Sequence, residues 1–283
     1  MEWRRLEEEA FKTAGFLSVS LVLLCLLAMI AAVLLKGLPA LSVEMITETP
    51  RSGFYLGGGG GVLNAIVGSI YLAAGGTALA FVMSLPTALF LQREYSGGGR
   101  IAEAVRLVLD ILWGVPSIVY GAFGFIIMLS LGLRASLLGG IISLAFVVFP
   151  IMTRSIDEIL QTVPQDLKEV SYAVGATRFE TTWSVTLRQA APGILTGIII
   201  AFGRGIGDAA SILFTAGYTD KVPSSLMEPA ASLPLAIFFQ FGTPFQGVQE
   251  RAYASAVILL VVILVLTSAA RMLGKASRRN MIV

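Results

Sequence analysis

The amino-acid sequence predicts an all-α membrane protein with six transmembrane helices. Hydrophobic residues make up 56% of the 283 residues and charged residues only 13%, whereas a soluble domain carries about 25% charged residues. Apolar segments of roughly the 20 residues that a bilayer requires recur along the chain. Lipid is therefore the expected main solvent. The six segments are 16–35, 62–91, 107–133, 136–152, 192–216 and 252–273.

The first apolar segment, 16–35, follows a charged stretch. Residues 1–15 contain Arg4, Arg5 and a run of three glutamates. Because the hydrophobic core of a cleaved signal peptide spans only about 7 to 15 residues, this longer segment is interpreted as a retained first span. Residues 1–15 are then an N-terminal segment outside the bilayer.

The second and third segments carry signs of helix tilt and helix packing. Segment 62–91 exceeds the roughly 20 residues that a bilayer requires, so it should tilt or project. Segment 107–133 contains Pro116, which should bend it. Its small and polar residues recur at spacings of four and three: Asp110, Gly114, Ser117, Gly121 and Gly124. Such a stripe faces other helices rather than lipid, which makes Ser117 a candidate residue of an internal pathway.

The composition excludes several kinds of chemistry. The chain has no histidine and one cysteine, Cys25, so disulfides, Cys/His metal sites and histidine-based catalysis are not expected. The glycine run 57–61 lacks the G-x-x-x-x-G-K-[ST] pattern of a P-loop, which occurs nowhere in the chain. No nucleic-acid-binding motif is present. We therefore expect no enzyme activity, no cofactor and no metal.

A long polar stretch, residues 157–191, separates the fourth and fifth segments. Pro164 suits the first position of a helix and Asp166 suits the positive end of its dipole. An apolar stripe follows at helical spacing, formed by Leu167, Val170 and Val174. Gly175 then stands where a left-handed C-terminal cap is needed. The pattern predicts a short amphipathic helix that ends at this glycine.

A second helix should begin directly afterwards. Thr177 and Glu180 have the T-x-x-E spacing of a capping box, which predicts a helix from Arg178 with Phe179 and Trp183 on one face. The two short helices around Gly175 are here called the knob (residues 164–183). The apolar stripe of the knob is too small to span a bilayer, so it should fit the groove of a partner.

Arg204 lies about midway along the fifth segment. A basic residue at the centre of a span costs about 2.5 to 3.5 kcal/mol on insertion scales, so a partner or a function is expected. Small and polar residues share its predicted helix face: Gly197, Ala201, Arg204, Asp208, Ser211 and Thr215. A guanidinium matches the oxygens of a tetrahedral oxyanion, so Arg204, Asp208 and Ser211 are candidates for a substrate pathway. The alternative is an Arg204–Asp208 pair that only fixes helix packing.

The stretch 217–251 joins the last two spans. Its centre, S-L-P-L-A-I-F-F-Q-F-G-T-P, is apolar but too short to cross a bilayer, so it should form a re-entrant or surface-lying segment. Six spans place both termini on one side. Fourteen lysines and arginines flank the spans on that side and five on the other, which predicts that both termini and the knob are cytoplasmic.

The polar stretch also resembles a known loop. The loop of ABC importer permeases has the pattern E-A-A-x-x-x-G, followed after nine residues by I-x-L-P. This chain has a similar pattern, E-V-S-Y-A-V-G followed after nine residues by V-T-L. Glu169, Ala173, Gly175, Val185 and Leu187 match, while Val170 and Ser171 replace two alanines and Arg188 replaces the proline. In that family this loop is the coupling helix that docks on the ATPase. The resemblance implies that role for Asp166, Leu167, Glu169, Val170, Ala173, Gly175, Ala176 and Phe179.

Further stretches resemble one group of these permeases. The similarity is to the A-type permeases of the bacterial phosphate-specific transport system and covers about residues 57–273. It is carried by three stretches: G-V-P-S-I-V-Y-G-A-F-G, A-P-G-I-L-T-G-I-I-I-A-F-G-R-G-I-G-D and L-P-L-A-I-F-F. Asp208 stands where that group has glutamate.

The resemblance implies a type I ABC importer permease fold of the inner membrane with its core at about 62–273. It implies one permease domain, 16–273, with a coupling loop, 157–191, and a cytoplasmic tail, 274–283. The implied partners are a second, related permease, two copies of a cytoplasmic ATPase, an extracytoplasmic phosphate-binding protein and phosphate.

Three other interpretations stay open. A permease for another oxyanion, such as sulfate or molybdate, would have the same coupling loop. A membrane-embedded enzyme would need an acid/base pair with a nucleophile, which the polar groups of the spans do not supply. An ATPase-independent channel or scaffold would leave the knob without a purpose.

Overall fold

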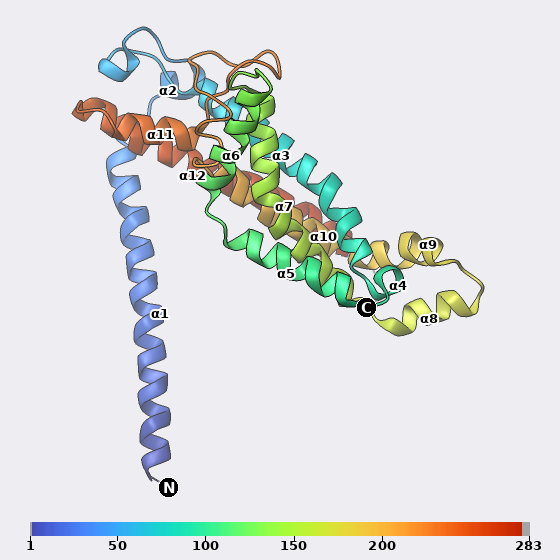
Figure 1. Ribbon diagram of the computed structural model, residues 1–283. Helices are drawn as coiled ribbons and strands as arrows, with labels where there is room; N and C mark the ends of the chain where they lie inside the picture. Colours follow the sequence, from blue (N-terminus) through green and yellow to red (C-terminus); the bar gives the residue numbers. More distant parts are fainter. Residues whose placement is uncertain (1, 279–283) are drawn as a thin grey trace.

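The computed structural model describes residues 2–278, and within this range every regular element is a helix (Figure 1). Four helices are long and apolar enough to span a membrane: α1 Glu2–Gly37, α3 Leu63–Phe90, α7 Leu137–Gln161 and α12 Gln246–Arg278. A fifth span runs without interruption over Arg178–Ile206 and comprises α9 Arg178–Thr181, the π-helical η2 Thr182–Thr186 and α10 Leu187–Ile206. A bent pair, α5 Arg100–Gly114 and α6 Ser117–Ser130, completes the expected six.

The third expected span is a broken helix rather than a bent one. The axes of α5 and α6 differ by 97°. Val115 and Pro116 are extended at the break, with ψ angles of 128° and 135°. Proline has no N–H to donate and disfavours helical conformation in the residue before it, so the chain turns a corner here.

Two other span boundaries differ from the prediction. The fourth span does not end near Pro150, because α7 continues through it to Gln161 and its polar end is paired with neighbouring helices. The fifth span was expected to reach residue 216, but α10 ends at Ile206 and residues 207–216 form turns. Hydrogen bonds that Ser211 donates to the Asp208 carboxylate favour the turn over a continued helix.

The core lies between α3 and α7, which pack along most of their length, with α10 against both. Leu72, Leu144, Val148 and Ile156 are buried at this centre. In contrast, α1 is exposed along its apolar length and meets α12 near Gly37. A Cβ at Gly37 would lie 2.5 Å from the carbonyl oxygen of Tyr253, so only glycine allows this approach.

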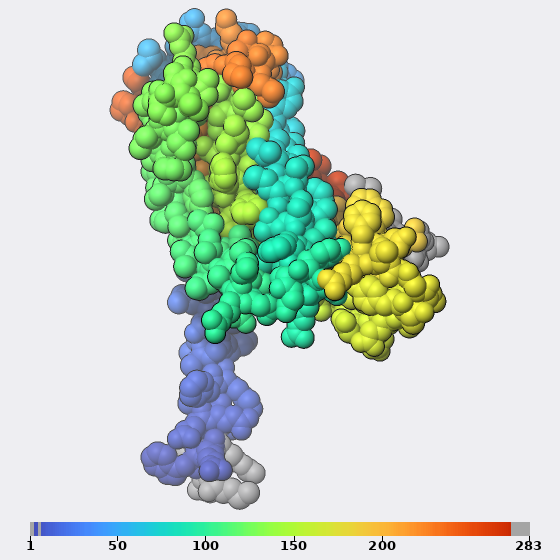
Figure 2. Space-filling view, turned by 45° about the vertical axis from the view of Figure 1, so that its right-hand side comes forward, coloured from blue at the N-terminus to red at the C-terminus, as the bar shows by residue number. Residues whose placement is uncertain are grey.

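The two ends of the bundle carry different structures (Figure 1). One end carries α4 Arg93–Ser96, α8 Gln165–Ala173 and α9, near the start of α5. The other end, here called the cap (residues 38–61 and 217–245), contains α2 Val43–Thr47, η1 Phe54–Leu56 and α11 Leu233–Phe241. Figure 2 shows the knob as a separate protrusion beside α3 and α5.

Candidate transport pathway and coupling site

The end of α10 carries the charged residue of the predicted pathway. Arg204 lies in the last turn with an exposed side chain, and it forms no ion pair within residues 2–278. Asp208 instead accepts hydrogen bonds from the backbone N of Ser211, at 3.1 Å, and from the Ser211 hydroxyl. The alternative, an Arg204–Asp208 pair that fixes helix packing, is therefore not formed, because the helix ends before Asp208 can reach that face.

The two predicted serines lie on neighbouring elements. Ser211 is fully buried in the turn after α10, and Ser117 is half-buried in the first turn of α6. One turn along α6, a Cβ at Gly121 would lie 2.6 Å from the carbonyl oxygen of Ser211. The start of α6 and the 207–216 turn are therefore packed together. The structure therefore brings the elements that carry Ser117 and Ser211 into contact. The hydroxyl of Ser211, however, already donates a hydrogen bond to Asp208.

Residues 207–216 are non-helical between two apolar spans. Inside a membrane such backbone is tolerated where it is buried in protein or lines a polar cavity, and discontinuous helices of this kind surround substrate sites in transporters. Arg204 adds five N–H donors beside this turn. The donors of Arg204 and the carboxylate of Asp208 therefore lie on either side of the point where α10 ends.

A buried ionic network joins α5 and α7 to the connection between α3 and α4, and it was not predicted from the sequence. Asp157 is fully buried and accepts from Arg106 at 2.8 and 3.1 Å, from Arg154 at 3.2 Å and from Gln92 at 2.9 Å. Arg154 also pairs with Asp110 at 2.8 Å. A buried carboxylate needs such partners, since an unpaired charge is costly there.

The sequence signal for this network is weak. Arg154 and Asp157 have the three-residue spacing of a helix pair, but Arg106 lies on α5 and Gln92 in the connection between α3 and α4. From the sequence alone, Arg106 and Arg154 are only two of the fourteen basic residues that flank the spans on one side. The spacing of one helix cannot reveal partners that other helices contribute.

The knob has the local structure that the sequence predicts. Gly175 is left-handed, with φ of 89°, and ends α8. Thr177 and Glu180 form both hydrogen bonds of a capping box. The rings of Phe179 and Trp183 stack with centroids 6.4 Å apart. The second helix is not short, however, because it continues through η2 into α10.

The outer surface of the knob is apolar. Val170, Val174, Phe179 and Trp183 are 65%, 81%, 69% and 66% exposed. The other predicted coupling residues Asp166, Leu167, Glu169, Ala173 and Gly175 are also exposed, and Ala176 is half-buried. Large exposed apolar side chains that lie together mark an interaction surface. The apolar face of the knob therefore does not pack against its own bundle.

These features define a class: a multi-span membrane component without catalytic groups of its own and with an exposed apolar projection. Residues 84–279 match the family described as "Binding-protein-dependent transport system inner membrane component". The chain belongs to this family, and within it to the PstA-like permeases. It is an inner-membrane permease component rather than an enzyme, and its family implies ATPase and binding-protein partners.

Two relatives and one solved structure illustrate the similarity. The phosphate transport system permease protein PstA of Haemophilus influenzae is 31% identical over 93% of this chain and 92% of its own length. PstA of Pasteurella multocida is 31% identical over 95% and 94%. The inward-facing MetNI methionine ABC transporter matches 76% of this chain and 95% of its own, with a TM-score of 0.64 at 17% identity. That likeness confirms the ABC importer permease fold.

Proposed function

We propose that this chain is the permease subunit through which inorganic phosphate enters the cell. In this proposal it pairs with a second, related permease. Two copies of a cytoplasmic ATPase drive transport, and the ATPase binds at the knob. An extracytoplasmic phosphate-binding protein delivers the substrate to the cap. Phosphate is the substrate that the names of the two PstA relatives state.

One observation carries the proposal: a single helix connects the exposed knob to Arg204. The helix Arg178–Ile206 is uninterrupted, and at 1.5 Å per residue it separates Arg178 from Arg204 by about 39 Å. A push on the knob therefore moves the guanidinium. ATP-driven closure of the ATPase pair would change access to the anion site without any chemistry in this chain.

The proposed orientation places the knob inside the cell. The excess of basic residues near the termini supports it, and the first turn of α1 lies toward the same end of the bundle as the knob (Figure 1). Residues 1–15 and 274–283 are then the cytoplasmic ends of one permease domain, 16–273. Residues 279–283 lie outside the described part of the chain.

The proposed site binds phosphate only weakly. The Arg204 guanidinium can donate two parallel hydrogen bonds to one phosphate. Asp208 lies four residues further on, and Ser211 holds its carboxylate in place. The negative charge of Asp208 opposes a second anion nearby, so a bound phosphate is released. Ser117, on the packed start of α6, lies at the edge of this site.

The test is Arg204→Gln in the complete transporter, reconstituted in vesicles with its ATPase and binding protein. Two charge-assisted hydrogen bonds, each about 1.5 to 3 kcal/mol, correspond to a loss of phosphate uptake of more than about 100-fold. Radioactive phosphate uptake measures the effect. Arg100→Gln is the matched control, because Arg100 is exposed at the start of α5, away from this turn.

Two results would contradict the proposal. Uptake by Arg204→Gln at the wild-type rate would remove Arg204 from the pathway. A wild-type complex that transports sulfate or molybdate in preference to phosphate would assign the chain to another oxyanion, since a guanidinium alone does not distinguish these tetrahedral anions.

A further inference from the structure

Helix α8 of the knob buries a charged side chain and exposes its apolar face. Its one buried side chain is Lys168, which is 5% exposed. The apolar stripe of α8 points outward instead, with Val170 and Val174 mostly exposed. An amphipathic helix normally buries its apolar face. Contacts other than apolar burial must therefore hold α8 against the bundle.

Those contacts come from α4, the short helix between α3 and α5. Lys168 Nζ lies 2.7 Å from Glu94 Oε1, and the two side chains are only 7% and 14% exposed. Burial by itself would raise the pKa of Glu94, but the hydrogen bond from Lys168 and the charges of Lys168 and Arg178 lower it below its usual value. The ion pair therefore persists at neutral pH.

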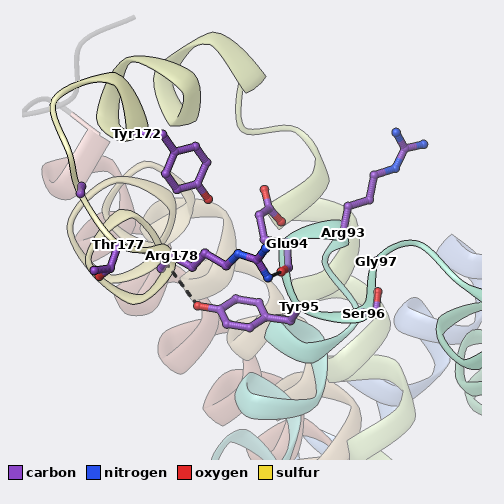
Figure 3. Close-up of a pocket in the computed structure, with 9 residues that line it drawn as sticks. Arg93, Glu94, Tyr95, Ser96, Gly97, Tyr172, Thr177 and Arg178 are labelled. Carbon is purple, nitrogen blue, oxygen red and sulfur yellow. Dashed lines mark hydrogen bonds between the residues drawn. The ribbon is translucent and has the colours of Figure 1, made fainter.

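The second helix of the knob also contacts α4. Arg178 Nη1 donates to the backbone oxygen of Glu94 at 2.9 Å, and the Tyr95 and Thr182 hydroxyls are 2.8 Å apart. Figure 3 shows Arg178 reaching toward Glu94 and Tyr95 toward the start of α9. An open cavity of about 800 Å³ lies between α4 and the knob. The polar contacts bridge this gap and join α4 to both helices of the knob.

The other side of α4 is anchored in the bundle. Gln92, the residue before α4, donates to buried Asp157 of α7, and Arg106 of α5 donates both to Asp157 and to the Leu91 backbone oxygen, at 2.9 Å for the latter. A continuous set of polar contacts therefore runs from Lys168 on the knob, through α4, to the ionic network of α5 and α7.

We infer that α4 is a strut that transmits movement of the knob to α5 and α7, with Glu94 and Lys168 as its positioning residues. This inference rests on the proposed function, in which an ATPase moves the knob. A buried ion pair adds little net stability compared with apolar packing, but it can fix one geometry. Without the strut, α8 would be held by the second helix of the knob, through the hydrogen bond between the Ser171 and Thr181 hydroxyls at 2.9 Å, and by the glycine turn at Gly175.

The experiment compares Glu94→Gln, Lys168→Gln and the swapped pair Glu94→Lys/Lys168→Glu in the complete reconstituted transporter. Each single variant should keep its ATPase subunits and hydrolyse ATP at the wild-type rate, while phosphate moved per ATP falls by about fivefold or more. The swapped pair should recover most of this ratio. Lys12→Gln, which breaks the exposed Lys12–Glu8 pair on α1, is the matched control and should have no effect.

A second measurement tests the geometry directly. Spin labels on the exposed positions Gln165 of α8 and Glu103 of α5, in a Cys25→Ala background, should report one narrow distance in the wild type. Glu94→Gln should broaden it. If Glu94→Gln disrupts the complex, Tyr95→Phe removes a single hydroxyl from the same strut and should lower the transport ratio by a smaller factor.

The outcomes separate the two claims. A Glu94→Gln or Tyr95→Phe transporter with the wild-type ratio and an unbroadened distance overturns the strut. Loss of ATPase binding in Tyr95→Phe overturns it too, because α4 would then be part of the docking surface. A wild-type transporter that moves no phosphate contradicts the proposed function instead, and the distance measurement still decides on the strut.

Discussion

The cap and the knob lie at opposite ends of the bundle and are built in opposite ways. In the cap, Phe54 and Leu233 are 2% and 0% exposed, and the charged side chains of Arg51 and Glu48 form an exposed ion pair at 2.7 Å. In the knob, Lys168 is buried while Val174 and Trp183 are exposed. The cap has an apolar core of its own, although it also exposes Val43, Leu56 and Phe238. The knob buries a lysine and leaves its large apolar side chains uncovered.

In the proposed assembly, this difference fits the kind of partner assigned to each end. Permanent interfaces are more apolar than transient ones. The knob therefore suits a subunit that stays bound, such as the ATPase. The mixed surface of the cap, where the Arg51–Glu48 ion pair lies among exposed side chains such as Val43, suits a soluble protein that docks and leaves, such as the binding protein. The comparison predicts that equivalent substitutions at the two ends affect different properties.

The largest expected effect is on stability and is confined to the cap. Phe54→Ala removes a fully buried ring and leaves a cavity, which should cost about 3 to 5 kcal/mol of unfolding free energy. Trp183→Ala in the knob should change it by no more than about 0.5 kcal/mol, because its ring is exposed. Unfolding of the purified chain in detergent measures both. Equal losses would remove the distinction between the two ends.

A second expected effect is on partner affinity and is confined to the knob. Val170→Asp places a charge on the apolar docking surface, and a substitution at an interface hot spot costs about 2 kcal/mol or more, which is roughly a 30-fold loss of ATPase affinity. Val43→Asp in the cap is the matched control, since Val43 is 77% exposed and Val170 is 65% exposed. Comparable losses from both substitutions would mean that the ATPase does not bind at the knob.

The knob could be predicted from sequence because its structure is set locally. The capping box joins residues three positions apart, and the left-handed turn needs only a glycine at position 175. Neither feature depends on a distant part of the chain. The same holds for the number of spans, since the length of an apolar segment determines whether it can cross a bilayer.

The pathway and the ionic network could be predicted only in part, because both depend on tertiary contacts. Helical periodicity placed Asp208 on the face of Arg204, but the hydrogen bonds of Asp208 to Ser211 end that periodicity. Asp157 is paired with Arg106, 51 residues earlier in the chain. Gln92, which also donates to Asp157, is 65 residues earlier than Asp157. A pattern read along one helix does not contain these pairings.

The smallest expected effect is a pH dependence of the cap. The Tyr55 hydroxyl is hydrogen-bonded to that of Tyr218. Burial raises the pKa of Tyr55 to about 12 and raises that of Tyr218 further. Tyrosine in an unfolded chain has a pKa of about 10. The stability that this pair provides should therefore be fully present below pH 10 and be lost as the pH rises through 12.

Tyr55→Phe tests this dependence. At neutral pH the substitution should cost about 1 kcal/mol, the net value of one hydrogen bond. Above pH 10 the wild type loses stability that the variant does not have, so the difference in unfolding free energy between them should shrink. Absorbance titration of the tyrosines should show the matching loss of a late-ionising group in the variant. A constant difference up to pH 12 would mean that solvent reaches the tyrosine pair. The core of the cap would then not be closed, and the cap would differ less from the knob than the structure indicates.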